Sequence, residues 1–312
     1  MNSIAMKARA KINLYLDVLA RRDDGYHDLI MIMQSLALYD SIFIKKVHKP
    51  NYLKLVTNLP WLPCDERNLA HKAASYLIKR FNISDGIFIE LHKVIPASAG
   101  LGGGSADCAA VLVGMRNLFD LPMSNDDLIE IGLQFGADVP FCVKRGCALA
   151  EGIGDRLTAL PPAPAAHVLL VRPPVPVSTA EIFRSYAKDD AAHNKSERHG
   201  DVNELQKSIS RNDFHTMASQ LYNALEPITA KKHPIILDIK SELIQLGAAG
   251  AMMSGSGPTV FGLFDNFAQA DAAKGAIKEA HPNFTEVFLT KFYNTNAESG
   301  RNSRQRNGIT HL

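Results

Sequence analysis

Pro96-Ala-Ser-Ala-Gly-Leu-Gly-Gly-Gly-Ser-Ala106 places four glycines within five positions. Before this stretch, apolar and polar residues alternate from Ile87 to His92, which predicts a half-buried strand that Pro96 ends. After it, apolar residues recur at steps of three and four from Cys108 to Phe119, which predicts a helix that begins near Ser105. The glycines therefore form a loop that leads from a strand into a helix.

This loop predicts a binding site for a polyphosphate. Glycines at 100, 102, 103 and 104 let the backbone take positive φ and approach a ligand closely. The free N–H groups of the helix's first turn, with the positive end of its dipole, then point at the ligand. The alternative is a glycine-rich turn without a ligand, but a strand-to-helix turn needs only one or two glycines. On this interpretation, a side chain at Gly103 would project into the ligand's path of approach.

Better-known glycine loops do not fit the spacing. A P-loop needs a lysine after its last glycine, and Gly104 is followed by Ser105. The dinucleotide fingerprint needs glycine or alanine five residues after its first glycine, and Ser105 stands there. The protein-kinase loop fails in the same way, and no His-Arg-Asp or Asp-Phe-Gly follows.

The composition favours a small-molecule ligand. The 312 residues are 46% hydrophobic with a net charge of +2, so nothing in the overall charge favours nucleic acid or a membrane surface. Six of the 16 prolines fall within 161–176, which predicts a domain boundary near residue 160. The four cysteines lack Cys-x-x-Cys spacing, and no apolar run reaches about 18 residues. We therefore expect reduced thiols and a cytoplasmic protein.

The N-terminal segment predicts a long strand that turns back on itself. Lys7 to Val18 alternate between apolar and polar residues, so Lys11 and Asn13 must point the same way. A solvated face is the simpler interpretation of these polar residues. A turn at Asp24-Gly25 then leads to a second apolar run over 29–44, with Tyr26 and His27 at the hairpin tip.

Further along, helices and loops are indicated by caps and periodicity. Three helices are marked by their ends: one over 65–81 capped by Asp65, one capped by Ser124 and Asp127 and ended by Gly136, and one from Phe214 that ends near Asn223 and Glu226 before Pro227. Two more helices are expected over 235–246 and 267–280, and a strand over 284–292. The polar composition predicts a mobile loop over 187–204 and a disordered tail over 295–312.

Two shorter motifs carry polar groups that need an explanation. In Gly136-Ala-Asp-Val-Pro-Phe141, Pro140 forbids continuation of the preceding helix, and the Asp138 carboxylate needs a partner among small and apolar neighbours. An Asx-turn or a helix cap would also explain Asp138. Residues 251–262 predict a strand, a Gly-Ser-Gly turn and a strand. This is an ordinary hairpin unless Gly255 and Gly257 let its backbone approach the first glycine loop.

These three motifs, in this order, resemble the kinases named for galactose, homoserine, mevalonate and phosphomevalonate (GHMP kinases). The loop matches their ATP-binding pattern, Pro-x-x-x-Gly-Leu-Gly-Ser/Gly-Ser/Gly-Ser/Ala-Ala, at every position. The resemblance implies an α+β fold with an N-terminal domain like the second domain of ribosomal protein S5 over 1–160 and a ferredoxin-like domain over 161–294. It places the active site in the cleft between them.

The resemblance also implies the roles of the site residues. Asp138 is expected to act as the catalytic base, and Lys11 to stabilise the developing alkoxide and the transferring phosphoryl group. ATP arrives with Mg²⁺; the sequence shows no metal-ligand spacing of its own and leaves open whether Ser105 or Glu151 touches that ion. The residues expected to bind ATP are Pro96, Gly100, Leu101, Gly102, Gly103, Gly104, Ser105 and Ala106, with Asn68 at the adenine.

Residues 8–14, 24–29 and 150–154 are similar to one branch of the family, whose acceptor is a cytidine diphosphate ester of a sugar alcohol. In this reading Tyr26 and Phe183 stack on the cytosine and His27 hydrogen-bonds its polar edge, although Phe183 also suits the core of the second domain. The full set expected to bind this acceptor is Asn13, Tyr26, His27, Phe183, Gly255, Ser256 and Gly257.

Alternatives to this branch remain open. A kinase of the homoserine or mevalonate type is the nearest, and the Tyr26-His27 pair argues against it. An RNA-binding use of the same fold predicts no glycine loop, and a sensor without catalysis predicts loss of Asp138 or Lys11, yet all are present. We expect a monomer or weak homodimer with no nucleic-acid or membrane partner.

Overall fold

The computed structural model describes residues 1–22, 27–189 and 200–295. Its framework is an antiparallel hairpin of two long strands, β1 (Ser3–Arg21) and β2 (His27–Val47), as the N-terminal alternation predicts. Register shifts interrupt the pairing between Arg9 and Lys11, between Asn13 and Tyr15, and between Val18 and Ala20. Such bulges bend a strand and re-aim its side chains.

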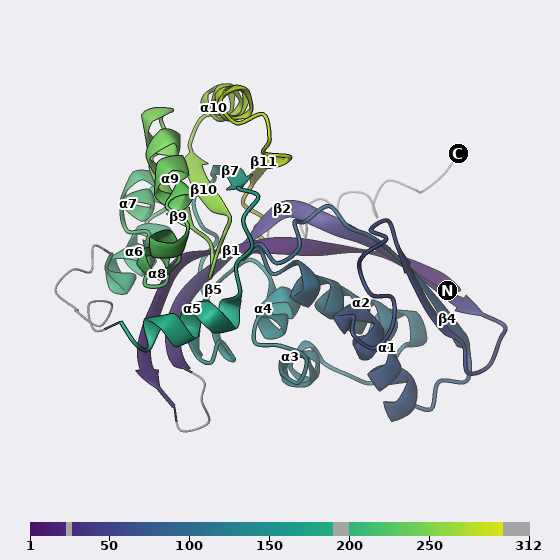
Figure 1. The fold of residues 1–312 in the computed structure, drawn as a ribbon. Coiled ribbons are helices and arrows are strands. Elements are labelled where there is room, and N and C mark those ends of the chain that lie inside the picture. Colours follow the sequence, from purple (N-terminus) through teal and green to yellow (C-terminus); the bar gives the residue numbers. More distant parts are fainter. Residues whose placement is uncertain (23–26, 190–199, 296–312) are drawn as a thin grey trace, which may run out of the picture.

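Five further strands extend this hairpin into one seven-stranded sheet. Its order is β3-β4-β2-β1-β8, with β5 paired to β2 and β6 to β5. The added strands are β3 (Leu53–Thr57), β4 (Gly86–His92), β5 (Cys147–Gly152), β6 (Arg156–Ala159) and β8 (Tyr222–Asn223). The helices that follow this sheet are α1 (Leu69–Arg80), α2 (Gly103–Phe119), α3 (Asn125–Leu133) and α4 (Val139–Lys144). They lie together below the long hairpin in Figure 1.

A second sheet lies on the other side of the hairpin in Figure 1. Its strands are β7 (His167–Arg172), β9 (Gly250–Met253), β10 (Val260–Phe264) and β11 (Glu286–Lys291), in the antiparallel order β11-β7-β10-β9. Its helices are α5 (Thr179–Tyr186), α6 (Val202–Ser210), α7 (Phe214–Ser219), α8 (Glu226–Lys232), α9 (Ile235–Gln245) and α10 (Phe267–Ala280). The fourth, first, third and second strands are neighbours, which is the ferredoxin-like order. The predicted α+β fold is confirmed.

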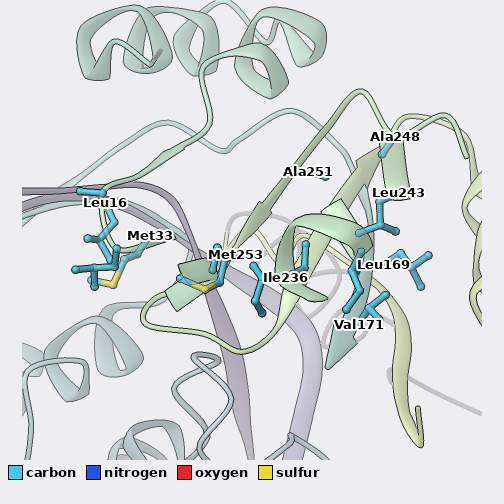
Figure 2. Close-up of a cluster of buried hydrophobic side chains, with 14 of the residues drawn as sticks. Leu16, Met33, Leu169, Val171, Ile236, Leu243, Ala248, Ala251 and Met253 are labelled. Carbon is cyan, nitrogen blue, oxygen red and sulfur yellow. The ribbon is translucent and has the colours of Figure 1, made fainter. Parts of the chain in front are cut away.

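The two sheets share a core. β8 lies beyond residue 160 but pairs with β1, through Tyr15 with Tyr222 and Leu16 with Asn223. In Figure 2, Leu16 and Met33 lie at the hairpin end of one buried cluster, and Leu169 and Val171 lie at the end formed by the second sheet. The boundary near 160 therefore stays a prediction, because chain from beyond it completes the first sheet.

Most predicted elements are present within a few residues of their expected ends. The strand before the glycine loop, the Ser124–Asp127 capping box and helices α9 and α10 are confirmed. Of the cysteines, Cys64 is exposed and the other three are buried, all of them free, as expected. No helix of the described residues is long and apolar enough to cross a membrane.

Four boundaries differ from the prediction, and the first two concern a cap and a proline. Asn68, not Asp65, caps α1, because its side chain accepts from the Ala70 N–H, whereas Asp65 pairs with Arg67. Pro140 opens α4 instead of only ending a helix, since proline is tolerated in a first turn.

The prediction of one continuous helix from 214 to 226 is wrong, because Pro227 again opens a helix and does not end one. The helix from Phe214 ends at Ser219, the chain extends along β1 as β8, and Pro227 lies in the first turn of α8. The loop expected over 187–204 is too long at its end, since α6 begins at Val202. Its residues 190–199 and the tail from 296 lie outside the described residues.

Candidate active site

A cleft of about 400 Å³ opens where β1, the first glycine loop, the start of α4, the second glycine loop and α5 meet. The predicted residues that line it are Lys11, Asn13, Gly100, Gly102, Gly103, Gly104, Ser105, Asp138, Phe183, Gly255 and Ser256. The sequence motifs therefore converge on one place, although they are spread over more than 240 residues of chain.

The N-terminus of α2 forms one wall of the cleft. Gly102 is its N-cap with φ 67°, a left-handed conformation that favours glycine, and the first helical bond runs from the Ala106 N–H to the Gly102 carbonyl at 2.8 Å. Within the described residues no side chain caps this helix, and its first turn holds no acidic residue. The N–H groups of 103–105 and the positive end of the dipole are therefore available to an anion.

The three consecutive glycines face different surroundings. A Cβ on Gly103 would lie 3.2 Å from both Ile95 Cγ2 and Lys93 Nζ, inside the protein, so the expectation that it projects toward the ligand is wrong. On Gly104 the nearest atom would be Leu69 Cδ1 at 3.9 Å, and both residues line the cleft. Gly104, not Gly103, is thus the position from which a side chain would enter the cleft.

Lys11 and Asp138 form the charged centre of the cleft. Lys11 Nζ lies 3.5 Å from Asp138 Oδ2 and donates to Asn13 Oδ1 at 2.8 Å, which confirms that Lys11 and Asn13 point the same way. The Lys11 side chain is 5% exposed and that of Asp138 33%. Asp138 occupies the N-cap position of α4, but its side chain makes no capping bond, so a cap does not account for this carboxylate.

The polar face of β1 is buried, so the solvated interpretation is wrong. Arg9, Lys11, Asn13 and Asp17 are each at most 9% exposed. The reason is that the hairpin is covered on both faces: its apolar residues Ala10, Ile12 and Leu14 pack with the second sheet, and the helices lie opposite. The Lys11 N–H also donates to the Leu101 carbonyl at 3.0 Å, which fastens the glycine loop to β1.

The two glycine loops touch each other. Ser254 Oγ donates to the Gly100 carbonyl at 2.9 Å, and a Cβ on Gly255 would lie 3.4 Å from the Gly100 oxygen. The predicted close approach at Gly255 is confirmed. The approach of Gly257 is confirmed too, because its carbonyl oxygen would lie 3.3 Å from a Cβ on Gly100. Its own φ is +88°, and a Cβ there would meet the Met253 side chain.

Asn223 is a residue that sequence reasoning missed. Its amide donates to the carbonyls of Met253 and Gly255, both at 2.8 Å, so it holds the second glycine loop from β8. The sequence pattern places Asn223 near a helix end. The available signal was its position beside the apolar pair Ala224-Leu225, since a polar side chain that is buried with such neighbours needs hydrogen-bond partners.

Phe183 and two hydroxyl side chains line the cleft, whereas His27 does not line it and packs against the Phe183 ring. The His27 and Phe183 ring centroids are 5.3 Å apart with planes tilted by 30°, whereas Tyr26 lies outside the described residues. Phe183 both lines the cleft and packs on the shared core. Thr179, which was also missed, lines the cleft with its hydroxyl 2.7 Å from that of Ser256. The Ser178-x-x-Glu181 capping pattern was the available signal for α5.

Other predicted residues lie behind the cleft wall. Asn68 uses its amide as a cap and as a donor to the Pro63 carbonyl, while its neighbour Leu69 lines the cleft, so an adenine contact of Asn68 stays a prediction. Pro96, Leu101 and Ala106 are buried. Ser105 lines the cleft and Glu151, on β5, does not. No group of three or more metal-binding His, Cys, Asp or Glu side chains occurs among the described residues.

Comparison with known proteins identifies relatives along most of the chain. Residues 68–146 match the GHMP kinases N terminal domain, and residues 194–283 match the GHMP kinases C terminal domain. A 4-diphosphocytidyl-2-C-methyl-D-erythritol kinase of Lachnoclostridium phytofermentans is 45% identical over 94% of this chain and 98% of its own.

Solved structures agree with this similarity. A crystal structure of a 4-(cytidine 5'-diphospho)-2C-methyl-D-erythritol kinase has a TM-score of 0.77 and 28% identity, covering 93% of this chain and 99% of that one. A homoserine kinase of Cytophaga hutchinsonii has a TM-score of 0.75 over 93% of this chain and 94% of its own. Its identity is 22%, so this second likeness concerns the fold alone.

Proposed function

Since this chain belongs to the 4-diphosphocytidyl-2-C-methyl-D-erythritol kinases of the GHMP kinase family, we propose that it phosphorylates the 2-hydroxyl of 4-diphosphocytidyl-2-C-methyl-D-erythritol with ATP. The reaction serves the non-mevalonate route to isoprenoid precursors. A bond forms between the acceptor's 2-oxygen and the γ-phosphorus while the bond from that phosphorus to the β–γ bridging oxygen breaks. The products are ADP and a phosphate monoester.

One observation carries the proposal of where this occurs: Lys11 Nζ lies 3.5 Å from Asp138 Oδ2 beside the uncapped N-terminus of α2. A partly exposed carboxylate beside a buried ammonium can be reached by a substrate hydroxyl, which is the geometry that a general base needs. We assign Asp138 to take the proton from the 2-hydroxyl. Lys11, oriented by Asn13, stabilises the forming alkoxide and the transferring phosphoryl group.

We assign the phosphates of ATP to the first turn of α2, supported by the N–H groups of 103–105 that no side chain caps. When bound with ATP, Mg²⁺ would neutralise part of the charge on these phosphates. Of the two residues considered for this ion, Ser105 lines the cleft and could offer its hydroxyl oxygen, whereas Glu151 does not line it. One such oxygen fits the ion, because Mg²⁺ keeps several waters and is held largely by the phosphates.

The acceptor's cytosine is proposed to lie against Phe183 and His27, with Tyr26 as a further stacking partner. Stacking tolerates any base and contributes about 1 to 3 kcal/mol. Discrimination must therefore come from hydrogen bonds to the polar edge of the base, for which His27 is the candidate. An unpaired buried group can reject a wrong analogue by roughly 10⁴-fold. Thr179, Ser256 and Asn13 line the same cleft, and we assign them to contact the sugar alcohol.

The test is turnover of the cytidine acceptor, its uridine counterpart, homoserine and mevalonate with ATP. We expect turnover of the cytidine acceptor alone, with the preference over uridine lost in His27→Ala. Asp138→Asn should lower kcat by about 10² to 10⁴ with little change in either KM, whereas Asp126→Asn, an exposed control on α3, should not. Equal turnover of both nucleotides would remove the cytosine site, and a nearly active Asp138→Asn would remove the base.

We also propose a cytoplasmic monomer or weak homodimer without a nucleic-acid or membrane partner. The support is a net charge of +2 and four free cysteines. Size-exclusion chromatography with light scattering at micromolar concentration tests the oligomeric state.

A further inference from the structure

A buried ion cluster lies behind the first glycine loop. Lys93 Nζ donates to Asp107 Oδ2 at 2.7 Å and makes a shorter bond to Asp40 Oδ2. Asp40, Lys93 and Asp107 are 0%, 7% and 3% exposed, and they come from β2, from the chain just after β4 and from α2. None of the three lines the cleft, so the proposed reaction does not use them directly.

The cluster holds the chain at both ends of the loop. Asp40 Oδ1 accepts from the N–H groups of Val94 at 2.5 Å and Ile95 at 2.8 Å, immediately before Pro96. Asp107 lies just after the loop, in the second turn of α2. Because Lys93 bonds to both carboxylates, the chain before the loop, at 94–95, and the chain after it, at Asp107, are both held at Asp40 on β2. Residues 96–102 form the loop between these two attachments. A Cβ on Gly103 would lie 3.2 Å from Lys93 Nζ, so the cluster lies directly beneath the loop.

Such a cluster is costly to bury and is weak evidence of a gain in stability. Asp107 Oδ1 is buried without a hydrogen-bond partner among the described residues. Burial raises the pKa of Asp107 to about 8, with Asp40 adding to the rise and Lys93 opposing it. Burial alone lowers the pKa of Lys93, but the two carboxylates raise it overall. The other titratable neighbour of Asp107 is Cys108, which lies next to it on α2. Apolar residues of similar volume would fill the space, but they would not fix the loop's two ends in one geometry.

We propose that Asp40, Lys93 and Asp107 are positioning residues that fix the glycine loop in the shape from which its N–H groups reach the phosphates of ATP. The inference rests on the proposed function in that the loop must hold ATP. Loosening the cluster should weaken ATP binding, whereas the acceptor end of the cleft and the Lys11–Asp138 pair should be unaffected, because neither contacts the cluster.

The experiment compares ATP binding, measured by calorimetry without acceptor, with steady-state kinetics. Asp107→Ala and Lys93→Met should each raise the ATP Kd and KM at least 10-fold, with kcat at saturating ATP and the acceptor KM within about 3-fold of wild type. Asp107→Asn keeps an oxygen that accepts from Lys93, so its ATP Kd should stay within about 3-fold. Ile277→Ala, a buried change on helix α10, which packs against the second sheet, controls for general loss of stability.

The idea is overturned if folded Asp107→Ala binds ATP like the wild type, or if Ile277→Ala weakens ATP binding equally at the same loss of Tm. Should Lys93→Met fail to fold, the Asp107→Ala and Asp107→Asn pair decides alone. Failure of the proposed function would look different. If the wild-type protein binds ATP but does not phosphorylate the cytidine acceptor, the proposed acceptor is wrong, and the comparison of ATP affinities among the variants still tests the cluster.

Discussion

Gly100 is where the two glycine loops meet most closely, and Gly100→Ala tests this contact. The residue has φ +75°, and a Cβ there would lie 2.1 Å from the Ser254 carbonyl oxygen and 3.0 Å from its carbon. Real Cβ atoms essentially never come closer than 3.0 Å, and the atoms that they would meet here are backbone. One loop must therefore move by about 1 Å.

The cost has two parts that the structure defines. A left-handed backbone with a Cβ costs about 1 to 2 kcal/mol. Movement also breaks the 2.9 Å bond from Ser254 Oγ to the Gly100 carbonyl, which contributes about 1 kcal/mol. Together they remove roughly 2 to 3 kcal/mol of folding free energy, about 5 °C of Tm. If the loops separate instead, the same energy appears as a rise of about 30- to 150-fold in the KM values for ATP and the acceptor.

The assays are thermal unfolding and the KM values for ATP and the acceptor. Gly104→Ala is the matched control, because its backbone is helical and the nearest atom to its Cβ, Leu69 Cδ1, is 3.9 Å away. We expect an unchanged Tm for this control and a raised ATP KM alone, since the methyl group enters the cleft. Wild-type Tm and KM values in Gly100→Ala, or a large loss of Tm in Gly104→Ala, would refute the contact geometry.

Three further predictions follow from single side chains. Because the folded-state pKa of Asp107 is raised from 3.8 to about 8, its stabilising contribution is complete below about pH 4 and lost as pH rises to about 8. Denaturant unfolding from pH 4 to pH 9 should show this slope in the wild type and a weaker one in Asp107→Asn. Asn68→Ser keeps a capping oxygen, so Tm should hold while ATP KM rises; an unchanged KM removes the adenine contact. Phe183→Ala should raise the acceptor KM about 5- to 100-fold. Phe183→Leu, which keeps apolar packing, should raise it nearly as much, and a wild-type KM there would leave Phe183 a core residue.

The glycine loop could be predicted from sequence because its signals are local. The strand before it repeats every two residues and the helix after it every three or four, so the loop's two boundaries follow from about 30 residues of chain. The same holds for the Ser124–Asp127 capping box. Motif order then brought Lys11 and Asp138 together through the family resemblance, and the structure places their charged atoms 3.5 Å apart.

Features that depend on distant chain could not be predicted. The polar face of β1 has the pattern of a solvated strand, and only the helices and the second sheet on its two sides bury it. β8 is two residues long, and its pairing with β1 joins residues more than 200 positions apart. No periodicity can appear in two residues, so Asn223 was assigned to a helix end instead of the support of the second glycine loop.

The glycine run itself shows why composition alone does not assign roles. Three consecutive residues look equivalent in sequence, but each step along a helix turns the Cβ direction by about 100°. Gly102 has a positive φ, and a Cβ there would lie 3.0 Å from Lys11 Cγ and 3.7 Å from Asp138 Oδ2. A side chain at Gly102 would therefore push the charged pair apart. Gly103 needs to be small because the Lys93 cluster lies beneath it, and Gly104 because a ligand would lie above it. The run is therefore three separate constraints in sequence, and only the last of them concerns the space into which a ligand would fit.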